Sequence, residues 1–369
     1  MPVDSVPAGP DTPFLAVDAA RMQHNLDRVA GVARAAGLEL RPHAKTHKCL
    51  EVARRQIAAG ATGLTVATIG EAEVFAAHAA ATGCRDLFIA YPLWVTGTKG
   101  RRLAALADQV RVRVGVDSVE GARQLAGELG TRSVEVVIEV DSGQHRTGVA
   151  PERSGEVASA ARDLGLDVVG VFTFPGHGYG IGDTRRDAAH DEARVLSVAA
   201  QRLSDEGIEP RVRSGGSTPT LDFADGGVLT EIRPGVYPFN DAQQLEMCSC
   251  GIHDASLWAV TTVVHRTGHR VVVDAGSKIL GADRPSWTTG FGRLPDHLDA
   301  RVTSLSEHHA VVEFPDGAAS EGIPAIGSRI RLIPNHVCTA VNLVDELMIV
   351  DDRGDVTERW DVVARGENS

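Results

Sequence analysis

The sequence predicts an α/β protein in which a closed (β/α)8, TIM-like barrel is followed by a smaller, β-rich domain. Over the first two-thirds of the 369 residues, eight short apolar segments alternate with Ala-rich stretches of helical character. Strands that are separated by helices pair in parallel, and eight such units can close a barrel. After Tyr237, strand-like segments follow one another with few helices between them. The alternative for the first part is an open, doubly wound sheet, but the Gly-x-Gly-x-x-Gly motif typical of that fold is missing after an early strand.

The predicted barrel begins with a helix and continues strand by strand. Asp18 is a suitable N-cap for a helix that reaches Ala36, and Gly37 ends it. Further helices are expected at Leu50–Ala59, Glu71–Ala80, Val119–Leu129 and Arg185–Asp205. The eight expected strands are Glu39–Pro42, Leu64–Ala67, Asp86–Ala90, Val110–Val116, Val134–Val140, Val168–Phe172, Arg211–Ser214 and Glu231–Pro234.

The C-terminal part has the pattern of a β-rich domain. Turns are expected at Thr267–Gly268 and Asp316–Gly317. The strands around them are expected at Ser256–Val264, Arg270–Val273, Arg301–Leu305, Ala310–Phe314 and Arg329–Ile333. We therefore predict a barrel domain over residues 13–239 and a β-rich domain over residues 240–369, which could also include residues 1–12.

Composition excludes several classes of function. The net charge of −12 argues against a nucleic-acid or anionic-membrane surface, because both require clustered positive charge. No apolar segment approaches the roughly 20 residues of a membrane span, and the first twelve residues lack the pattern of a signal peptide. The five cysteines are odd in number and scattered, so we expect reduced thiols and a cytoplasmic location.

The segment from Arg41 to Lys48, Arg-Pro-His-Ala-Lys-Thr-His-Lys, is the first candidate site. Lys45 follows the first predicted strand, at the end of the barrel where barrel enzymes place their catalytic groups. A lysine there can form a Schiff base when neighbouring positive charge lowers its pKa, and His43, His47 and Lys48 are such neighbours. The alternative is a solvated basic loop before a helix. From the residues alone, the two interpretations are equally good.

A second candidate is a phosphate-binding loop after the seventh predicted strand. Consecutive small residues let backbone N–H groups converge on an anion, and hydroxyl groups add donors. Barrels often hold a phosphate in the loops after strands seven and eight. The alternative is an ordinary Gly-rich turn. The candidate residues in these two loops are Ser214, Gly215, Gly216, Ser217, Thr218, Gly235 and Tyr237.

Other polar groups follow neighbouring strands or the β-rich segments. His177 and Tyr179 follow the strand that ends at Phe172, and their Gly neighbours leave them free to approach a ligand; the alternative is a mobile polar loop. Glu307 and His308 are candidates for a nearby acid, base or supporting group, or else belong to a polar turn.

A possible metal site is His336-Val-Cys338. In a strand these two side chains point to one face and can bind zinc while leaving positions open for substrate. A half-buried His beside an apolar Cys is the generic alternative, and from the residues alone it is favoured. Cys248 and Cys250 are a second possible pair, interpreted as a segment at the domain junction.

Taken together, these motifs resemble the D-serine dehydratase and D-threonine aldolase family, whose members are fold-type III pyridoxal-phosphate (PLP) enzymes with an alanine-racemase-like barrel. The resemblance runs in order through nearly the whole chain. It is carried by Thr12–Asp18, Arg41–Lys48, Glu139–Gly148, Gly176–Tyr179, Ser214–Thr220, Glu231–Tyr237, Asp274–Lys278 and Pro334–Cys338.

The resemblance implies roles for several of these residues. Lys45 would carry the cofactor, and Arg146 would lie near the phenolic oxygen of the cofactor. Arg233 is at the position where alanine racemases place the arginine that faces the ring nitrogen. The Gly-rich loop would hold its phosphate. In this family the β-rich domain carries a pair of metal-binding residues near the cofactor. Dehydratases tend to have His-x-Cys at this position, and aldolases tend to have His-x-Asp. The metal would be Zn²⁺, with Mn²⁺ as a possible replacement.

The implied activity is a lyase that acts on D-3-hydroxy amino acids. Dehydration to a 2-oxo acid and ammonia is expected, with retro-aldol cleavage to glycine and an aldehyde as the second possibility. A racemase and a non-catalytic PLP carrier are the remaining alternatives, but the β-rich domain argues against a carrier. The resemblance also implies a homodimer and a small-molecule substrate. D-Serine, D-threonine and 3-hydroxyaspartate are all candidate substrates.

Overall fold

The computed structural model describes residues 6–7, 9–130 and 132–369, which form two compact units. The barrel unit contains Arg28–Lys45, Leu50–Gly235 and Gly366–Ser369. The β unit contains the described residues up to Asp27 together with Thr46–Cys49 and Val236–Arg365. The chain therefore passes from the barrel unit into the β unit directly after Lys45. Residues 1–5 and 8, which the sequence allowed in the β-rich domain, lie outside the described residues.

The predicted (β/α)8 barrel is confirmed. Eight strands pair in parallel in the order β2-β9-β8-β7-β6-β5-β4-β3. A parallel bridge between His43 and Thr65, with the Thr62 amide donating to the Leu40 carbonyl at 2.9 Å, joins the two ends of the sheet. The strands are β2 (Glu39–Leu40), β3 (Leu64–Val66), β4 (Asp86–Pro92), β5 (Arg111–Val116), β6 (Glu135–Glu139), β7 (Asp167–Phe172), β8 (Val212–Gly215) and β9 (Glu231–Ile232).

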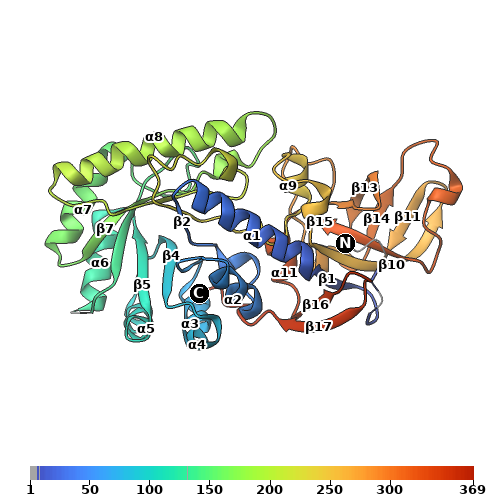
Figure 1. Cartoon of the computed structure of the whole chain (residues 1–369), viewed down its shortest axis with the longest axis horizontal. Coiled ribbons are helices and arrows are strands. Elements are labelled where there is room, and N and C mark those ends of the chain that lie inside the picture. Colours follow the sequence, from blue (N-terminus) through green and yellow to red (C-terminus); the bar gives the residue numbers. More distant parts are fainter. Residues whose placement is uncertain (1–5, 8, 131) are drawn as a thin grey trace. The chain divides into compact units, whose positions relative to one another are not determined.

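Helices connect these strands, and Figure 1 shows α5–α8 along the outside of the barrel strands. Several begin at caps that the sequence provides: the Thr68 hydroxyl accepts the Glu71 amide, and the Ser118 hydroxyl accepts the Gly121 amide. The helices are α1 (Ala19–Ala35), α2 (Leu50–Ala58), α3 (Ile69–Ala77), α4 (Ala79–Thr82), α5 (Gly97–Ala107), α6 (Val119–Leu129), α7 (Ser154–Asp163) and α8 (Thr184–Asp205). Four 3₁₀ turns are η1 (Ala44–Thr46), η2 (Pro151–Arg153), η3 (Gly176–Gly178) and η4 (Leu221–Phe223).

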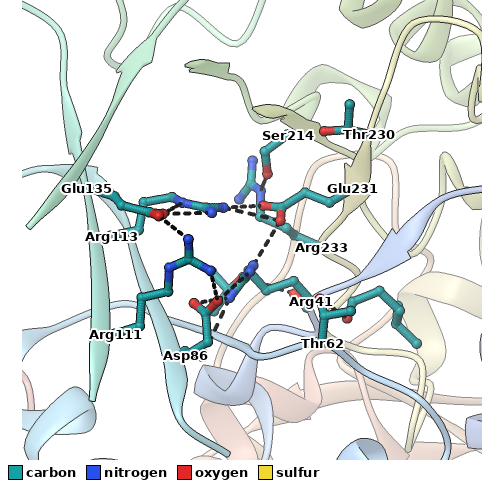
Figure 2. Close-up of polar contacts among 12 residues, drawn as sticks. Arg41, Thr62, Asp86, Arg111, Arg113, Glu135, Ser214, Thr230, Glu231 and Arg233 are labelled. Atoms are coloured by element: carbon teal, nitrogen blue, oxygen red, sulfur yellow. Dashed lines mark hydrogen bonds and ion pairs between the residues drawn. The ribbon is translucent and has the colours of Figure 1, made fainter. Parts of the chain in front are cut away.

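The barrel interior has an apolar layer and a charged layer. Phe88, Val137, Val169 and Phe172 form an apolar cluster in which the two rings meet edge to face, with centroids 5.1 Å apart. Asp86, Glu135 and Glu231 are the first residues of β4, β6 and β9. Buried ion pairs link Arg41 to Asp86 and Glu231, and Arg113 to Glu135 and Glu231, near these amino ends (Figure 2). Because the catalytic end of a barrel is the opposite one, we interpret this network as structural.

The β unit is built on a nine-stranded, mostly antiparallel sheet in the order β11-β14-β13-β12-β15-β10-β1-β16-β17. Its strands are β1 (Phe14–Asp18), β10 (Leu257–Thr267), β11 (Arg270–Val273), β12 (Gly292–Leu294), β13 (His297–Leu305), β14 (Ala310–Glu313), β15 (Arg329–Pro334), β16 (Glu346–Val350) and β17 (Val356–Asp361). Short helical segments are α9 (Ala242–Glu246), η5 (Ile252–Asp254), α10 (Ser277–Leu280), η6 (Ser320–Gly322) and α11 (Val337–Val341).

The first strand differs from the sequence prediction, which placed residues from 13 onward in the barrel domain. β1 pairs with β10 and β16 and belongs to the β unit. All five of its residues are buried, so both faces of the strand are covered. Phe14 and Ala16 pack into one core with Trp258 and Met348. Among the described residues, no helix is long and apolar enough to cross a membrane.

Candidate active site

Lys45 lies at the carboxyl end of β2, in the turn η1. Its side chain is half-buried, and Nζ lies 5.9 Å from the centroid of the Phe174 ring. The three predicted positive neighbours of Lys45 have different hydrogen-bond partners. His43 accepts the Lys45 amide on Nδ1 at 3.4 Å, whereas Lys48 donates to Asn342 Oδ1 at 2.8 Å within the β unit. His47 is also in the β unit, where its Nδ1 accepts the Cys49 amide.

Phe174, which follows β7, gathers several of the candidate groups. The Arg146 guanidinium lies 5.4 Å from its ring centroid, and the Tyr179 ring lies 6.1 Å away. The structure thus brings Lys45, Arg146 and Tyr179 to one aromatic ring at the carboxyl end of the barrel. Sequence reasoning missed Phe174, because an aromatic residue after a strand is usually part of the core.

A small pocket beside this ring contains a carboxyl group that the sequence analysis did not single out. Glu139, the last residue of β6, is buried, and its Oε1 accepts the Thr147 hydroxyl at 3.0 Å. Its Oε2 is buried without a hydrogen-bond partner. Burial raises the pKa of Glu139 to about 7. The pocket is lined by Glu139, Val140, Asp141, Gln144, Arg146, Thr147, Thr173 and Phe174.

The Gly-rich loop after β8 has the small residues of an anion-binding loop, but some of its backbone amides already donate to side chains of the protein. The Gly216 amide donates to Glu192 Oε1 at 2.6 Å, and the Ser217 amide donates to Thr220 Oγ1 at 3.0 Å. The Thr218 hydroxyl is buried and has no hydrogen-bond partner. A buried polar group without a partner is costly, so Thr218 is the side chain of this loop best placed to bind a ligand.

Ser214 and Arg233 make bonds within the barrel. Arg233 Nε donates to Ser214 Oγ at 2.8 Å, another guanidinium nitrogen donates to the Thr173 carbonyl, and the group lies 5.5 Å from the ring centroids of Phe88 and Phe172. Burial lowers the pKa of Arg233. These contacts hold the side chain inside the barrel, and a contact of Arg233 with a cofactor ring stays a prediction.

His177 is in the turn η3 after β7, as the sequence placed it. Neither ring nitrogen has a hydrogen-bond partner, although Nε2 lies 3.6 Å from Asp191 Oδ2. The ring packs against Gly143, where an added Cβ would lie 3.1 Å from it. Gly235 and Tyr237 follow β9, and Tyr237 is fully buried. The half-buried His177 therefore has unused hydrogen-bonding capacity at the carboxyl end of the barrel.

The possible metal pair lies on a turn, which corrects the strand predicted for it. β15 ends at Pro334, and His336 is the N-cap of α11, in which Cys338 is the second residue. At this turn the Asn335 side chain donates to the carbonyls of Asp283 and Gly290.

The environment of the pair nevertheless suits a metal ligand. His336 Nδ1 lies 3.4 Å from Asp241 Oδ2, and the Asp241 carboxylate is fully buried, accepting amides from Val337 and Gln244. Burial by itself lowers the pKa of His336, but the adjacent Cys338 thiolate and Asp241 carboxylate raise it well above its ordinary value. Cys338 Sγ lies 3.1 Å from the hydroxyl of Thr46. Sequence reasoning missed Asp241, because it is 95 positions before His336 and is brought next to the imidazole only by folding.

The remaining candidates are exposed or half-buried. Glu307 is exposed, and a bond from Lys278 at 2.8 Å lowers its pKa, so this carboxylate is a poor proton donor. His308 is exposed beside it in the turn between β13 and β14. Cys248 is exposed and Cys250 half-buried. Within the described part of the chain, no group of three or more His, Cys, Asp or Glu residues is arranged to hold a metal.

Comparison with known proteins places this site in a family. The family model of the alanine racemase N-terminal domain matches residues 17–242, and that of a serine dehydratase domain matches residues 256–350. The chain belongs to the alanine racemase N-terminal-domain family. This match confirms the resemblance that the motifs carry and the alanine-racemase type of the barrel.

Within this alanine racemase-like family, the chain resembles enzymes that carry both domains. It is 32% identical to a D-threonine aldolase from Arthrobacter sp. over 96% of this chain and 93% of that protein. It is 34% identical to a D-threo-3-hydroxyaspartate dehydratase from Delftia sp., over 89% of this chain and 91% of that protein. A crystal structure of D-threonine aldolase from Filomicrobium marinum superposes with a TM-score of 0.86 at 29% identity, covering 96% of each chain.

Proposed function

We propose that this alanine racemase-like protein is a PLP- and metal-dependent lyase that dehydrates D-3-hydroxy amino acids to 2-oxo acids and ammonia. The observation that carries the proposal is the presentation of His336 and Cys338 on one turn, with Asp241 against the imidazole. D-threo-3-hydroxyaspartate dehydratase has been solved with a histidine replaced by alanine and, in a metal-free form, with a cysteine two positions later replaced by alanine. The same spacing separates His336 and Cys338.

The barrel unit fits PLP by its donor set. Lys45 offers a primary amine at the carboxyl end of β2, and the partnerless Thr218 hydroxyl offers a donor in the loop that sequence reasoning assigned to the phosphate. Gly215 lets the Glu192 carboxyl group approach this loop, because a Cβ there would lie 2.4 Å from Glu192 Oε1. Arg146 is a cation for the anionic oxygen of the ring. When bound, PLP supplies an electron sink for the negative charge that develops at the substrate Cα.

The metal proposal depends on the chemistry of His336 and Cys338. An imidazole nitrogen and a thiolate are preferred ligands of Zn²⁺, and two protein ligands leave positions for substrate and water; Mn²⁺ is the second choice. Asp241 would orient the imidazole through Nδ1, as carboxylates commonly do for metal-binding histidines. When bound, the metal supplies Lewis-acid stabilisation to a departing 3-hydroxyl group.

Two residues of the chain, Lys45 and His177, would carry out the proton transfers. Lys45 Nζ would remove the Cα proton of a D-amino acid. His177, with no hydrogen-bond partner on either ring nitrogen, would exchange a proton with a substrate group on the same side of the barrel. We do not assign a step to Glu307 or His308, because both are exposed and Glu307 is engaged by Lys278.

Retro-aldol cleavage is the second candidate, and the similarity to the Arthrobacter D-threonine aldolase over 96% of this chain favours it. In that reaction the 3-hydroxyl loses its proton and the Cα–Cβ bond breaks, so that glycine and an aldehyde are formed. In the dehydration the C–O bond breaks instead. The two reactions therefore differ in their products, whatever the rate.

Product analysis separates these functions. The purified protein is incubated with PLP and Zn²⁺ and with D-serine, D-threonine, D-threo-3-hydroxyaspartate or D-alanine, and the L-enantiomers serve as controls. A 2-oxo acid with an equal amount of ammonia supports the proposal, glycine with an aldehyde supports the aldolase, and L-alanine formed from D-alanine would indicate a racemase. PLP binding without turnover of any of them would indicate a carrier.

We also propose that the active form is a cytoplasmic homodimer, as the resemblance implies. Light scattering at micromolar concentration, with and without PLP, tests the dimer. A mass close to the 39.0 kDa of one chain in both samples would contradict it.

A further inference from the structure

Glu192 is a buried carboxyl group in direct contact with the Gly-rich loop. It lies on the inner side of α8, with 1% of its surface exposed, and its Oε1 accepts the Gly216 amide at 2.6 Å. The contact depends on the glycines. A Cβ on Gly215 would lie 2.4 Å from Oε1, and Gly216 has a φ of +77°, which side chains rarely adopt.

The position of this carboxyl conflicts with the function proposed for the loop. Backbone amides at such a loop serve to bind a phosphate, yet here an acidic side chain occupies the Gly216 amide. A phosphate dianion in the same loop and an ionised Glu192 would repel each other in a poorly solvated environment, where charges interact strongly. One of the two negative charges therefore has to be reduced when the phosphate binds.

The surroundings of Glu192 allow it to lose its charge. The cation acting on it is Arg233, which is bonded to Ser214 and Thr173. Asp191, its neighbour on α8, lies against His177 of η3 and pairs with Arg194. Burial raises the pKa of Glu192 to about 7, although the Gly216 amide and Arg233 oppose the change. The carboxyl is thus close to half-protonated at neutral pH before any ligand arrives.

We propose that Glu192 is a proton-carrying positioning residue of the phosphate loop: when the phosphate group of PLP binds, Glu192 takes up one proton from solution and stays in place as a neutral acid. This inference rests on the proposed function, since it concerns the same cofactor. The protonated carboxyl keeps a carbonyl oxygen that still accepts the Gly216 amide. The new O–H group is a hydrogen-bond donor, and the neutral carboxyl group no longer repels the phosphate. No bond other than the O–H bond forms or breaks.

Calorimetric titration of the full-length apoprotein with PLP tests the coupling. Titrations at pH 8 in two buffers that differ in ionisation enthalpy give the number of protons taken up. The Glu192→Gln variant keeps an acceptor for the Gly216 amide and removes the titrating group, while Lys45 contributes equally to both proteins. Asp187→Asn, on the exposed side of the same helix, is the matched control and should behave like the wild type.

We expect the wild type and the control to take up about one proton more per PLP than Glu192→Gln. Relative to that variant, the affinity of the wild type should fall by about fivefold between pH 7 and pH 8 and by about tenfold between pH 8 and pH 9. Equal proton counts in the wild type and Glu192→Gln would overturn the inference while leaving PLP binding intact. Failure of the wild type to bind PLP would instead overturn the proposed function.

An infrared measurement on the wild type covers the case in which the variant does not fold. Adding PLP to the apoprotein at pH 8 should produce a new band in the region of protonated carboxyl groups, shifted in D₂O. A difference spectrum without that band would overturn the inference without any substitution. A role of Glu192 limited to holding the loop predicts no band and no extra proton.

Discussion

Glu231 makes the stability of the barrel depend on pH in the acid range. Its carboxylate is buried between Arg41, at 2.9 Å, and Arg113, at 3.2 Å (Figure 2). Burial alone would raise its pKa, but the two guanidinium charges and a hydrogen bond from Ser214 lower it from 4.5 to about 2. Since one pKa unit corresponds to about 1.4 kcal/mol, the ionised carboxylate contributes on the order of 3 kcal/mol to the free energy of unfolding.

The sign of the pH effect follows from the direction of the shift. The folded-state pKa lies below the unfolded-state value, so the stabilisation is fully present above about pH 4.5 and is lost as the pH falls towards 2. Glu231→Gln removes the titrating group and leaves two buried guanidinium groups without their shared carboxylate. At pH 7 the free energy of unfolding should therefore fall by about 3–5 kcal/mol.

Urea denaturation followed by circular dichroism between pH 3 and pH 7 measures both effects. Between pH 4.5 and pH 3, the wild type should lose stability more steeply than Glu231→Gln. Glu156→Gln, which removes an exposed carboxylate paired with Arg153, is the control and should follow the wild type. Parallel pH profiles for the wild type and Glu231→Gln would refute the reasoning, because the network would then contribute nothing that depends on ionisation.

Three further predictions concern the site. Lys45→Ala should abolish the visible absorbance of bound PLP and all turnover, and an unchanged spectrum would remove Lys45 from its proposed role. His336→Ala, or thorough chelation, should stop 2-oxo acid formation while leaving that absorbance in place; full activity after chelation would eliminate the metal. Thr218→Val should weaken PLP binding by about tenfold, the value of one hydrogen bond from a buried hydroxyl, as measured by fluorescence titration, with Thr357→Val on β17 as the control. Equal affinities of the two variants would exclude Thr218 from the phosphate site.

The barrel could be predicted from the sequence because its signal is local. Each strand appears as a short apolar segment, and all eight predicted strands overlap those of the structure. The predicted helices overlap α1, α2, α3, α6 and α8, whereas α5 and α7 were not predicted. The position of Lys45 at the carboxyl end of β2 could be predicted for the same reason, and its role as the cofactor lysine stays a prediction. The strand geometry expected for His336 and Cys338 was wrong, because β15 ends at Pro334 and α11 begins at Val337.

By itself, the sequence determined the alternation of strands and helices and the identity of the family, and it predicted which residues would bind PLP and a metal. Only the tertiary structure decided that β1 joins the β unit, that Asp241 lies against His336, and that Glu139 and Glu192 are carboxyl groups with pKa values near neutrality. The physical reason is that hydrophobic periodicity depends on neighbouring residues, whereas desolvation and charge–charge interactions depend on which distant segments surround a group once the chain has folded.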